Sequence, residues 1–159
     1  MIAARFGPLL AVFVSVAVCQ PPSLIVDGGN GKTLTLTAKD LSDLPQHTIK
    51  TTDHDAPVTF EGVLLSDVLA KVDLPTGEKL RGKLMTLYLL VEAADGYKTV
   101  FSLPELDPAF TDRKVYLVSK RDGKPLAEKE GPFRIVIPDE KRASRWVRQV
   151  TALKVRQAN

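Results

Sequence analysis

The stretch EGPFRIVIPDEKRASRWVRQV (residues 130–150) places a cation inside an apolar run. The letters FRIVIP have the nearly continuous apolar character of a buried strand, yet Arg134 stands among them. A buried arginine requires an anion, because an unpaired charge away from water is strongly unfavourable. The sequence leaves two kinds of anion open: a protein carboxylate, with Asp95 or Glu92 as candidates, or a bound ligand.

The composition is that of a globular domain. The 159 residues are enough for one hydrophobic core, and 44% of them are hydrophobic and 26% charged. The net charge of +3 is spread along the chain, and aromatic residues make up only 6%. Nucleic-acid binding is therefore not expected, since it uses a basic patch or stacking side chains.

Residues 1–19 have the organisation of a signal peptide, with a positive charge at Arg5, an apolar run over residues 6–18 and small residues near its end. The run is short for a membrane-spanning helix. We therefore predict a periplasmic or secreted protein, with residues 20–23 as a linker and residues 24–156 as the folded domain. Two alternatives involve the membrane: a lipid on Cys19, or a segment that stays attached as an anchor.

The rest of the chain predicts many short strands and a few short helices, which is typical of a mixed α+β domain. Thr37 is suited to cap the first helix. The helices are expected over residues 38–44 and 62–75. The strands are expected over residues 24–36 with a turn at GGNG, 47–62, 84–102 with a turn at Asp95 and Gly96, 114–119, around Arg134, and 144–155.

Five short motifs follow one another along this pattern. They are Phe-Glu-Gly-Val-x-Leu (60–65), Ala-Asp-Gly-Tyr (94–97), Asp-Gly-Lys-Pro-Leu (122–126), Gly-Pro-Phe-Arg-Ile-Val-Ile-Pro (131–138) and Arg-Trp-Val-Arg-Gln-Val (145–150). In this order they resemble the oxidoreductase molybdopterin-binding domain, the fold of sulfite oxidase and its bacterial relatives. The resemblance implies a mixed α+β domain that surrounds a pterin dithiolene carrying molybdenum.

The resemblance also implies a cysteine thiolate ligand on the extended segment before the Gly-Val-x-Leu motif. Thr51, Thr52 and Asp53 stand at that place, and Cys19 is the only cysteine of the chain. A hydroxyl or carboxylate oxygen is no equivalent of a soft thiolate, and Glu130 beside the Gly-Pro-Phe-Arg motif would repel a cofactor phosphate. We therefore predict no metal site, no catalytic residue and no cofactor, with molybdopterin as the alternative that the resemblance implies.

The predicted ligand-binding residues are Arg134, Tyr97, Arg142 and Arg145. By the resemblance, Arg134 matches the arginine that faces the pterin phosphate, and Tyr97 lines the pocket mouth. Arg142 and Arg145 belong to a basic segment before the last strand, and an arginine fork suits phosphate or carboxylate. The alternatives are structural: an internal ion pair for Arg134, a hairpin turn for Tyr97, and a solvated face for the other two.

A second cluster, TTDHDAP (51–57), combines His54 with Asp53 and Asp55. Neighbouring side chains of a strand point to opposite faces, so these groups cannot all converge on one metal. A solvated turn is the expected structure.

These observations predict an exported domain of the molybdopterin-binding oxidoreductase type without molybdenum catalysis. It would act as an accessory domain that binds an anionic small molecule or a cell-envelope protein. The alternative is a true molybdopterin-dependent oxidoreductase with atypical metal ligation.

Overall fold

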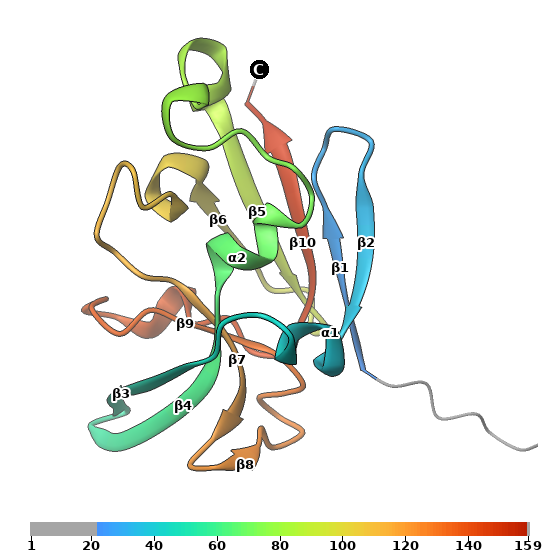
Figure 1. Cartoon of the computed structure of the whole chain (residues 1–159). Coiled ribbons are helices and arrows are strands. Elements are labelled where there is room, and N and C mark those ends of the chain that lie inside the picture. The colour runs from blue at the N-terminus through green and yellow to red at the C-terminus, as the bar shows by residue number, and fades with distance from the viewer. Residues whose placement is uncertain (1–21, 159) are drawn as a thin grey trace, which may run out of the picture.

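The computed structural model describes residues 22–158 (Figure 1). The predicted signal peptide and Cys19 lie outside the described residues, as do the first two residues of the predicted linker. Among the described residues, no helix combines the length and the apolar character needed to cross a membrane.

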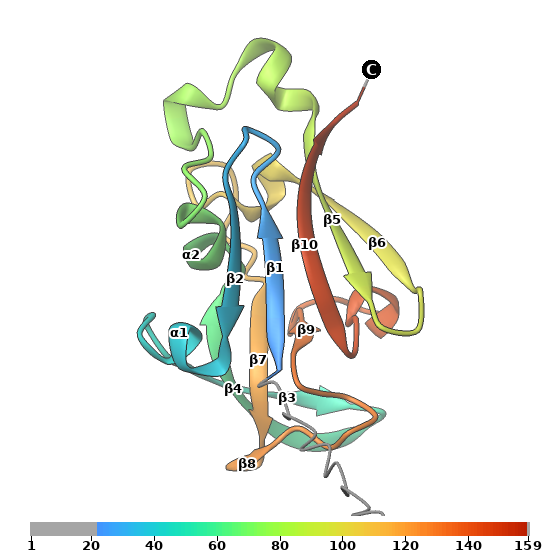
Figure 2. The same ribbon diagram turned by 90° about the vertical axis from the view of Figure 1, so that its right-hand side faces the viewer.

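One sheet has five strands in the order β2-β1-β10-β5-β6 (Figure 2). Two antiparallel hairpins form its flanks: β1 (Ser23–Asp27) with β2 (Thr33–Thr37), and β5 (Leu87–Ala93) with β6 (Lys98–Ser102). The last strand, β10 (Val150–Gln157), lies between them, parallel to β1 and antiparallel to β5. The sheet therefore joins the beginning and the end of the described chain.

The second sheet is built on β7 (Tyr116–Arg121). On one side β7 pairs with β4 (Ala56–Leu64), which forms a hairpin with β3 (His47–Asp53). It also pairs with β8 (Lys124–Pro125) and β9 (Arg134–Val136). The β3–β4 hairpin projects at the opposite end of the molecule from the loops that precede β5 (Figure 1).

Two short α-helices complete the described part of the chain. Thr37 caps α1 (Ala38–Ser42) through a reciprocal capping box with Asp40, as the sequence predicts for this position. The second helix, α2 (Leu65–Ala70), follows β4 directly. Four 3₁₀ segments are η1 (Gly77–Lys79), η2 (Gly82–Thr86), η3 (Leu103–Leu106) and η4 (Ala143–Arg145). The predicted mixed α+β class is confirmed.

The two sheets share one hydrophobic core, since a single cluster contains Leu24 and Leu89 of the first sheet together with Phe60 and Ile135 of the second. Where β4 pairs with β7, Gly62 leaves room for the backbone of the partner strand. A Cβ atom at Gly62 would lie 2.2 Å from the carbonyl oxygen of Leu117. The glycine of the Phe-Glu-Gly-Val motif is thus required by strand packing.

Three predicted elements are shorter than expected. The helix expected over 62–75 covers only Leu65–Ala70, because β4 continues to Leu64, which pairs with Tyr116. The strand expected from residue 84 begins at Leu87. The last strand begins at Val150 rather than at residue 144, and η4 takes the place of its first part.

Candidate functional site

Arg134 of β9 and Asp53 at the end of β3 form a buried ion pair. Nη1 of Arg134 donates to Oδ2 of Asp53 at 3.0 Å, and Nη2 donates to Oδ1 at 3.3 Å. The side chains are 1% and 2% exposed. The anion that the sequence requires for Arg134 is therefore a protein carboxylate, but neither Asp95 nor Glu92. Glu92 pairs with Lys98 and Lys154 instead.

Two further charged side chains complete the cluster around this pair. Glu130 Oε1 accepts from Nη1 of Arg134 at 3.2 Å and from Nη1 of Arg121 at 3.0 Å. Nη1 of Arg121 also donates to Oδ2 of Asp53 at 3.2 Å. Two guanidinium groups thus alternate with two carboxylates, and the formal charges of the four groups cancel. Glu130, expected to repel a phosphate, here neutralises arginine.

Aromatic rings close over the cluster. The guanidinium carbon of Arg134 lies 5.2 Å from the ring centre of Phe60 and 5.6 Å from that of Trp146. These distances are within the range of cation–π attraction. Trp146 is fixed in place because its Nε1 donates to the carbonyl oxygen of Ile137 at 3.1 Å. The two rings help to bury Arg134, and burial strengthens the attraction between Arg134 and Asp53.

Burial is the largest single influence on Asp53, and it favours the neutral carboxyl group. The hydrogen bond from Arg134 and the charges of Arg134 and Arg121 act in the opposite direction and together outweigh burial. The pKa of Asp53 is therefore lowered below its ordinary value. Asp53 is an ionised carboxylate at neutral pH.

This arrangement corrects the expectation for the TTDHDAP cluster. The turn exists, with His54 and Asp55 at positive φ values of 50° and 66°. His54 is exposed, but Asp53 is buried rather than solvated. Alternation along β3 explains this, because Ile49, Thr51 and Asp53 share one face and Ile49 belongs to the core.

A surface hollow of about 420 Å³ lies beside the ion pair. Its lining includes two of the four predicted ligand-binding residues, Arg134 and Tyr97, and also Arg148. Nε of Arg134 is buried and has no hydrogen-bond partner among the described residues. Nη2 of Arg148 lies 3.4 Å from Nε2 of His54. The hollow therefore brings together the exposed guanidinium of Arg148, the buried Nε of Arg134 and the carboxyl group of Asp95.

The other predicted site residues lie elsewhere or have other partners. The hydroxyl of Tyr97 donates to the carbonyl oxygen of Ser144 at 2.7 Å, which ties the β5–β6 turn to η4. Arg145 is held by Glu105 and Glu140 and stacks on Phe101 at 4.7 Å. The structure thus brings Arg134 and Tyr97 together at one hollow but leaves Arg145 outside it. Ligand binding by these residues stays a prediction.

Arg142, which precedes η4, is exposed and does not line the hollow that Arg134 and Tyr97 share. Arg148 belongs to the same basic segment of the sequence. Only the fold shows that, among the arginines of this segment, Arg148 lines the hollow.

The residues at this place do not fit a molybdenum dithiolene cofactor. The segment that would supply a thiolate supplies Asp53, and both oxygens of its carboxylate accept hydrogen bonds from Arg134. Within residues 22–158, no three His, Cys, Asp or Glu side chains gather in a metal-binding arrangement. The arginine expected to face a cofactor phosphate is already neutralised.

The sequence over residues 53–159 matches the family model of the oxidoreductase molybdopterin-binding domain. The matched region begins at Asp53 and contains Arg134, so it includes both partners of the ion pair. The family resemblance that the five sequence motifs indicate is confirmed. No curated protein sequence matches the chain.

The structure is similar to the crystal structure of the sulfane dehydrogenase SoxCD from Paracoccus pantotrophus, with a TM-score of 0.63 and 24% sequence identity. The match covers 84% of this chain but only 38% of that one. The similarity therefore establishes the fold, and this chain spans well under half the length of the larger protein.

Proposed function

Since the chain belongs to the oxidoreductase molybdopterin-binding family, we propose that it keeps the family fold without molybdenum catalysis and acts as a binding domain of the cell envelope. The observation that carries this proposal is the ion pair between Arg134 and Asp53. The carboxylate stands on the segment where the family resemblance implies the metal-binding thiolate. The same carboxylate neutralises the arginine that the resemblance assigns to the cofactor phosphate.

Electrostatics explains why this pairing disfavours a cofactor. A phosphate that approached Arg134 would have to displace Asp53 or Glu130, and each displaced carboxylate would lose a hydrogen-bonded cation in a buried place. If neither moved, the phosphate would meet two negative charges. Both arrangements make phosphate binding less favourable. A family member without these two carboxylates would bind the phosphate without that cost in free energy.

The hollow beside the pair supports the anion-binding part of the proposal. Arg148 is exposed there, and its guanidinium contacts the ring of His54 rather than a carboxylate. Tyr97 forms another part of the lining. A small anionic molecule, or a carboxylate of a cell-envelope partner, would find its cation in Arg148 and not in Arg134. Export through the N-terminal segment is part of the same proposal.

Cofactor content tests the catalytic part. The full chain is produced in a host that makes molybdopterin and exports proteins, and purified protein is analysed for molybdenum by mass spectrometry and for pterin by fluorescence after oxidation. A catalytic member of the family, produced in parallel, serves as the positive control. We expect neither molybdenum nor pterin. About one of each per chain would overturn the proposal in favour of an oxidoreductase with atypical ligation.

The Asp53→Ala variant sharpens this test. It removes the carboxylate that neutralises Arg134 and leaves the arginine in place. Pterin in the folded variant, together with none in the wild-type protein, would identify Asp53 as the group that excludes the cofactor. Circular dichroism establishes that the variant is folded before its content is interpreted.

A further inference from the structure

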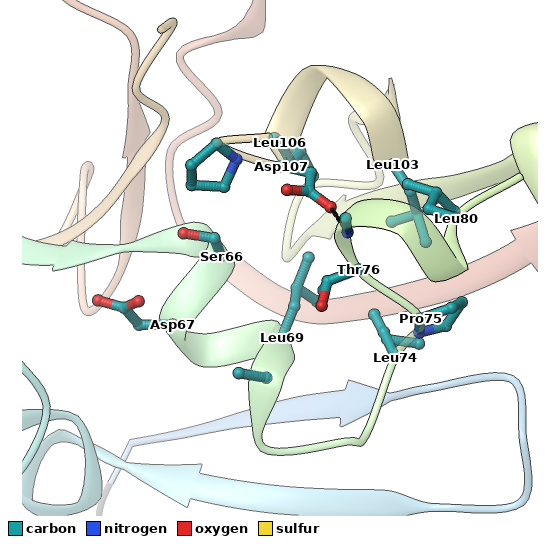
Figure 3. Close-up of a pocket in the computed structure, with 13 residues that line it drawn as sticks. Ser66, Asp67, Leu69, Leu74, Pro75, Thr76, Leu80, Leu103, Leu106 and Asp107 are labelled. Atoms are coloured by element: carbon teal, nitrogen blue, oxygen red, sulfur yellow. Dashed lines mark hydrogen bonds between the residues drawn. The ribbon is translucent and has the colours of Figure 1, made fainter. Parts of the chain in front are cut away.

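An apolar hollow of about 370 Å³ lies on another part of the molecule, between α2, the segment that follows it and η3 (Figure 3). Leu69, Leu80, Leu103 and Leu106, all buried, contribute to its lining. The volume falls within the range of about 300–1,000 Å³ that is usual for small-molecule sites. A predominantly apolar lining with few polar groups is also usual for such sites.

The polar groups of this hollow are of two kinds. Asp107 is a fixed part of the wall, because its Oδ2 accepts from the amide of Gly77 at 2.6 Å and its Oδ1 accepts from the amide of Ala109 at 2.9 Å. Ser66 and Asp67 line the hollow at the start of α2 (Figure 3). With the carboxyl groups of Asp67 and Asp107 in its lining, the apolar hollow is a poor place for a further negative charge.

A second hollow of about 390 Å³ adjoins the first one. The two share the lining residues Ser66, Leu106 and Pro108. The second hollow is more polar and has Arg113 and Lys114 in its lining.

The lining of the second hollow carries two cations, Arg113 and Lys114, and one carboxylate, Asp112. Arg113 pairs loosely with Asp139, at 3.5 Å, and Asp112 is a further carboxylate of the lining. Lys114 is exposed and has no ion-pair partner in the described part of the chain. Its ammonium group is the cation that an anionic ligand would meet.

We propose that the two hollows form one binding site for a small amphiphile with an apolar body and a carboxylate head. The body lies among the leucines of the first hollow, and the head lies at Lys114 and Arg113 in the second. Apolar burial supplies the larger part of the affinity, and the charge at Lys114 selects an anionic head over a neutral or cationic one. This site is separate from Arg134 and does not depend on the proposed function.

Sodium decanoate, used below its micellar concentration, is the probe, and calorimetric titration into the full-length protein measures its binding. Decanol and decyltrimethylammonium have the same apolar body with a neutral and a cationic head. We expect saturable binding of decanoate, weaker binding of decanol and none of the cation. Equal binding of all three, or no saturable binding of decanoate, would overturn the proposal.

Two variants locate the site. Ala70→Trp fills the apolar hollow from an exposed position, so it does not disturb the core, and it should abolish binding. Lys114→Glu should weaken decanoate binding by roughly tenfold or more, the effect of losing one charge-assisted contact. Lys124→Glu, an exposed lysine on β8 that lines neither hollow, is the matched control and should bind as the wild type does.

The variants also separate other occupants from the proposed one. Binding that Ala70→Trp abolishes but Lys114→Glu leaves intact would mean a purely apolar site and would contradict the carboxylate assignment. If a second copy of the chain fills the hollow, the protein will form a dimer that Ala70→Trp dissociates and that decanoate does not affect. That result, measured by analytical ultracentrifugation, would also overturn the proposal.

Discussion

Arg134 and Asp53 lie 81 residues apart in the chain, and each carboxylate oxygen of Asp53 accepts a hydrogen bond from one terminal nitrogen of Arg134. This geometry joins β9 to the far end of β3 and satisfies an arginine that the sequence shows to be inside a buried strand. Its partner is part of the protein, so the folded state is electrostatically complete at this place without a ligand.

Removal of the carboxylate should destabilise the fold strongly. Asp53→Ala leaves Arg134 buried with Glu130 as its remaining partner, and breaking a buried pair from one side costs about 3–5 kcal/mol. Urea unfolding at pH 7 measures the loss. Lys32→Ala, which breaks an exposed pair with Asp73, is the control and should have little effect. A loss for Asp53→Ala as small as that of the control would mean that Glu130 alone neutralises Arg134.

Acid should reduce the stability that the ion pair between Arg134 and Asp53 contributes to the fold. The pKa of Asp53 is lowered in the folded protein, so the unfolded chain takes up the proton first as the pH falls. The stabilisation is therefore fully present above the ordinary value of 3.8 and is lost as the pH falls from there through the folded pKa. The difference in unfolding free energy between wild type and Asp53→Asn should be constant near neutrality and shrink below pH 3.8. A difference that grows on acidification would contradict the lowered pKa.

The two arginines of the cluster should differ in importance. Arg134→Met should destabilise the fold more than Arg121→Met, because Arg134 is 1% exposed and makes two bonds to Asp53, whereas Arg121 is 33% exposed and makes one. Solvent around Arg121 screens its charge and reduces its contribution. Thermal unfolding of both variants at the same pH gives the order. Equal losses would indicate that the four charges act as one unit.

Gly62→Ala tests the close approach of the paired strands β4 and β7. The added methyl group would lie 2.2 Å from the carbonyl oxygen of Leu117, so the strands must separate. Overpacking of this kind costs about 1–3 kcal/mol. Chemical denaturation should show this loss for Gly62→Ala and a much smaller one for Thr59→Ala, a partly exposed position of the same strand. An unchanged denaturation midpoint for Gly62→Ala would mean that the backbones of β4 and β7 lie farther apart at Gly62 in solution.

The sequence predicts the outline of the fold because its turns and caps are strong local signals. The Asp95 and Gly96 turn and the Thr37 cap form where their residue types predict. Local patterns fail where an apolar run is compatible with two structures. Val63 and Leu64 fit a helix by spacing, yet pairing with β7 keeps them in a strand.

The partner of Arg134 illustrates a different difficulty. The burial of Arg134 follows from the apolar run around it, but the identity of its anion depends on which distant strand end packs against β9. Asp53 sits in a polar segment, TTDHDAP, that suggests a solvated turn. Alternation from Ile49 through Thr51 is the signal that places Asp53 on the inward face. The positions of Arg142 and Arg145 depend on η4, which the alternating sequence pattern did not predict.

The place of β10 between the two hairpins of the first sheet has a consequence for biogenesis. A chain that emerges from the ribosome N-terminus first contains the residues of both hairpins long before those of this strand. Only when Val150–Gln157 has emerged can the pairing with β1 and β5 join them. Because such distant pairing is slow and leaves strand edges open until it occurs, the first sheet cannot close before β10 has been made, and the edges of β1 and β5 that β10 covers stay open until then.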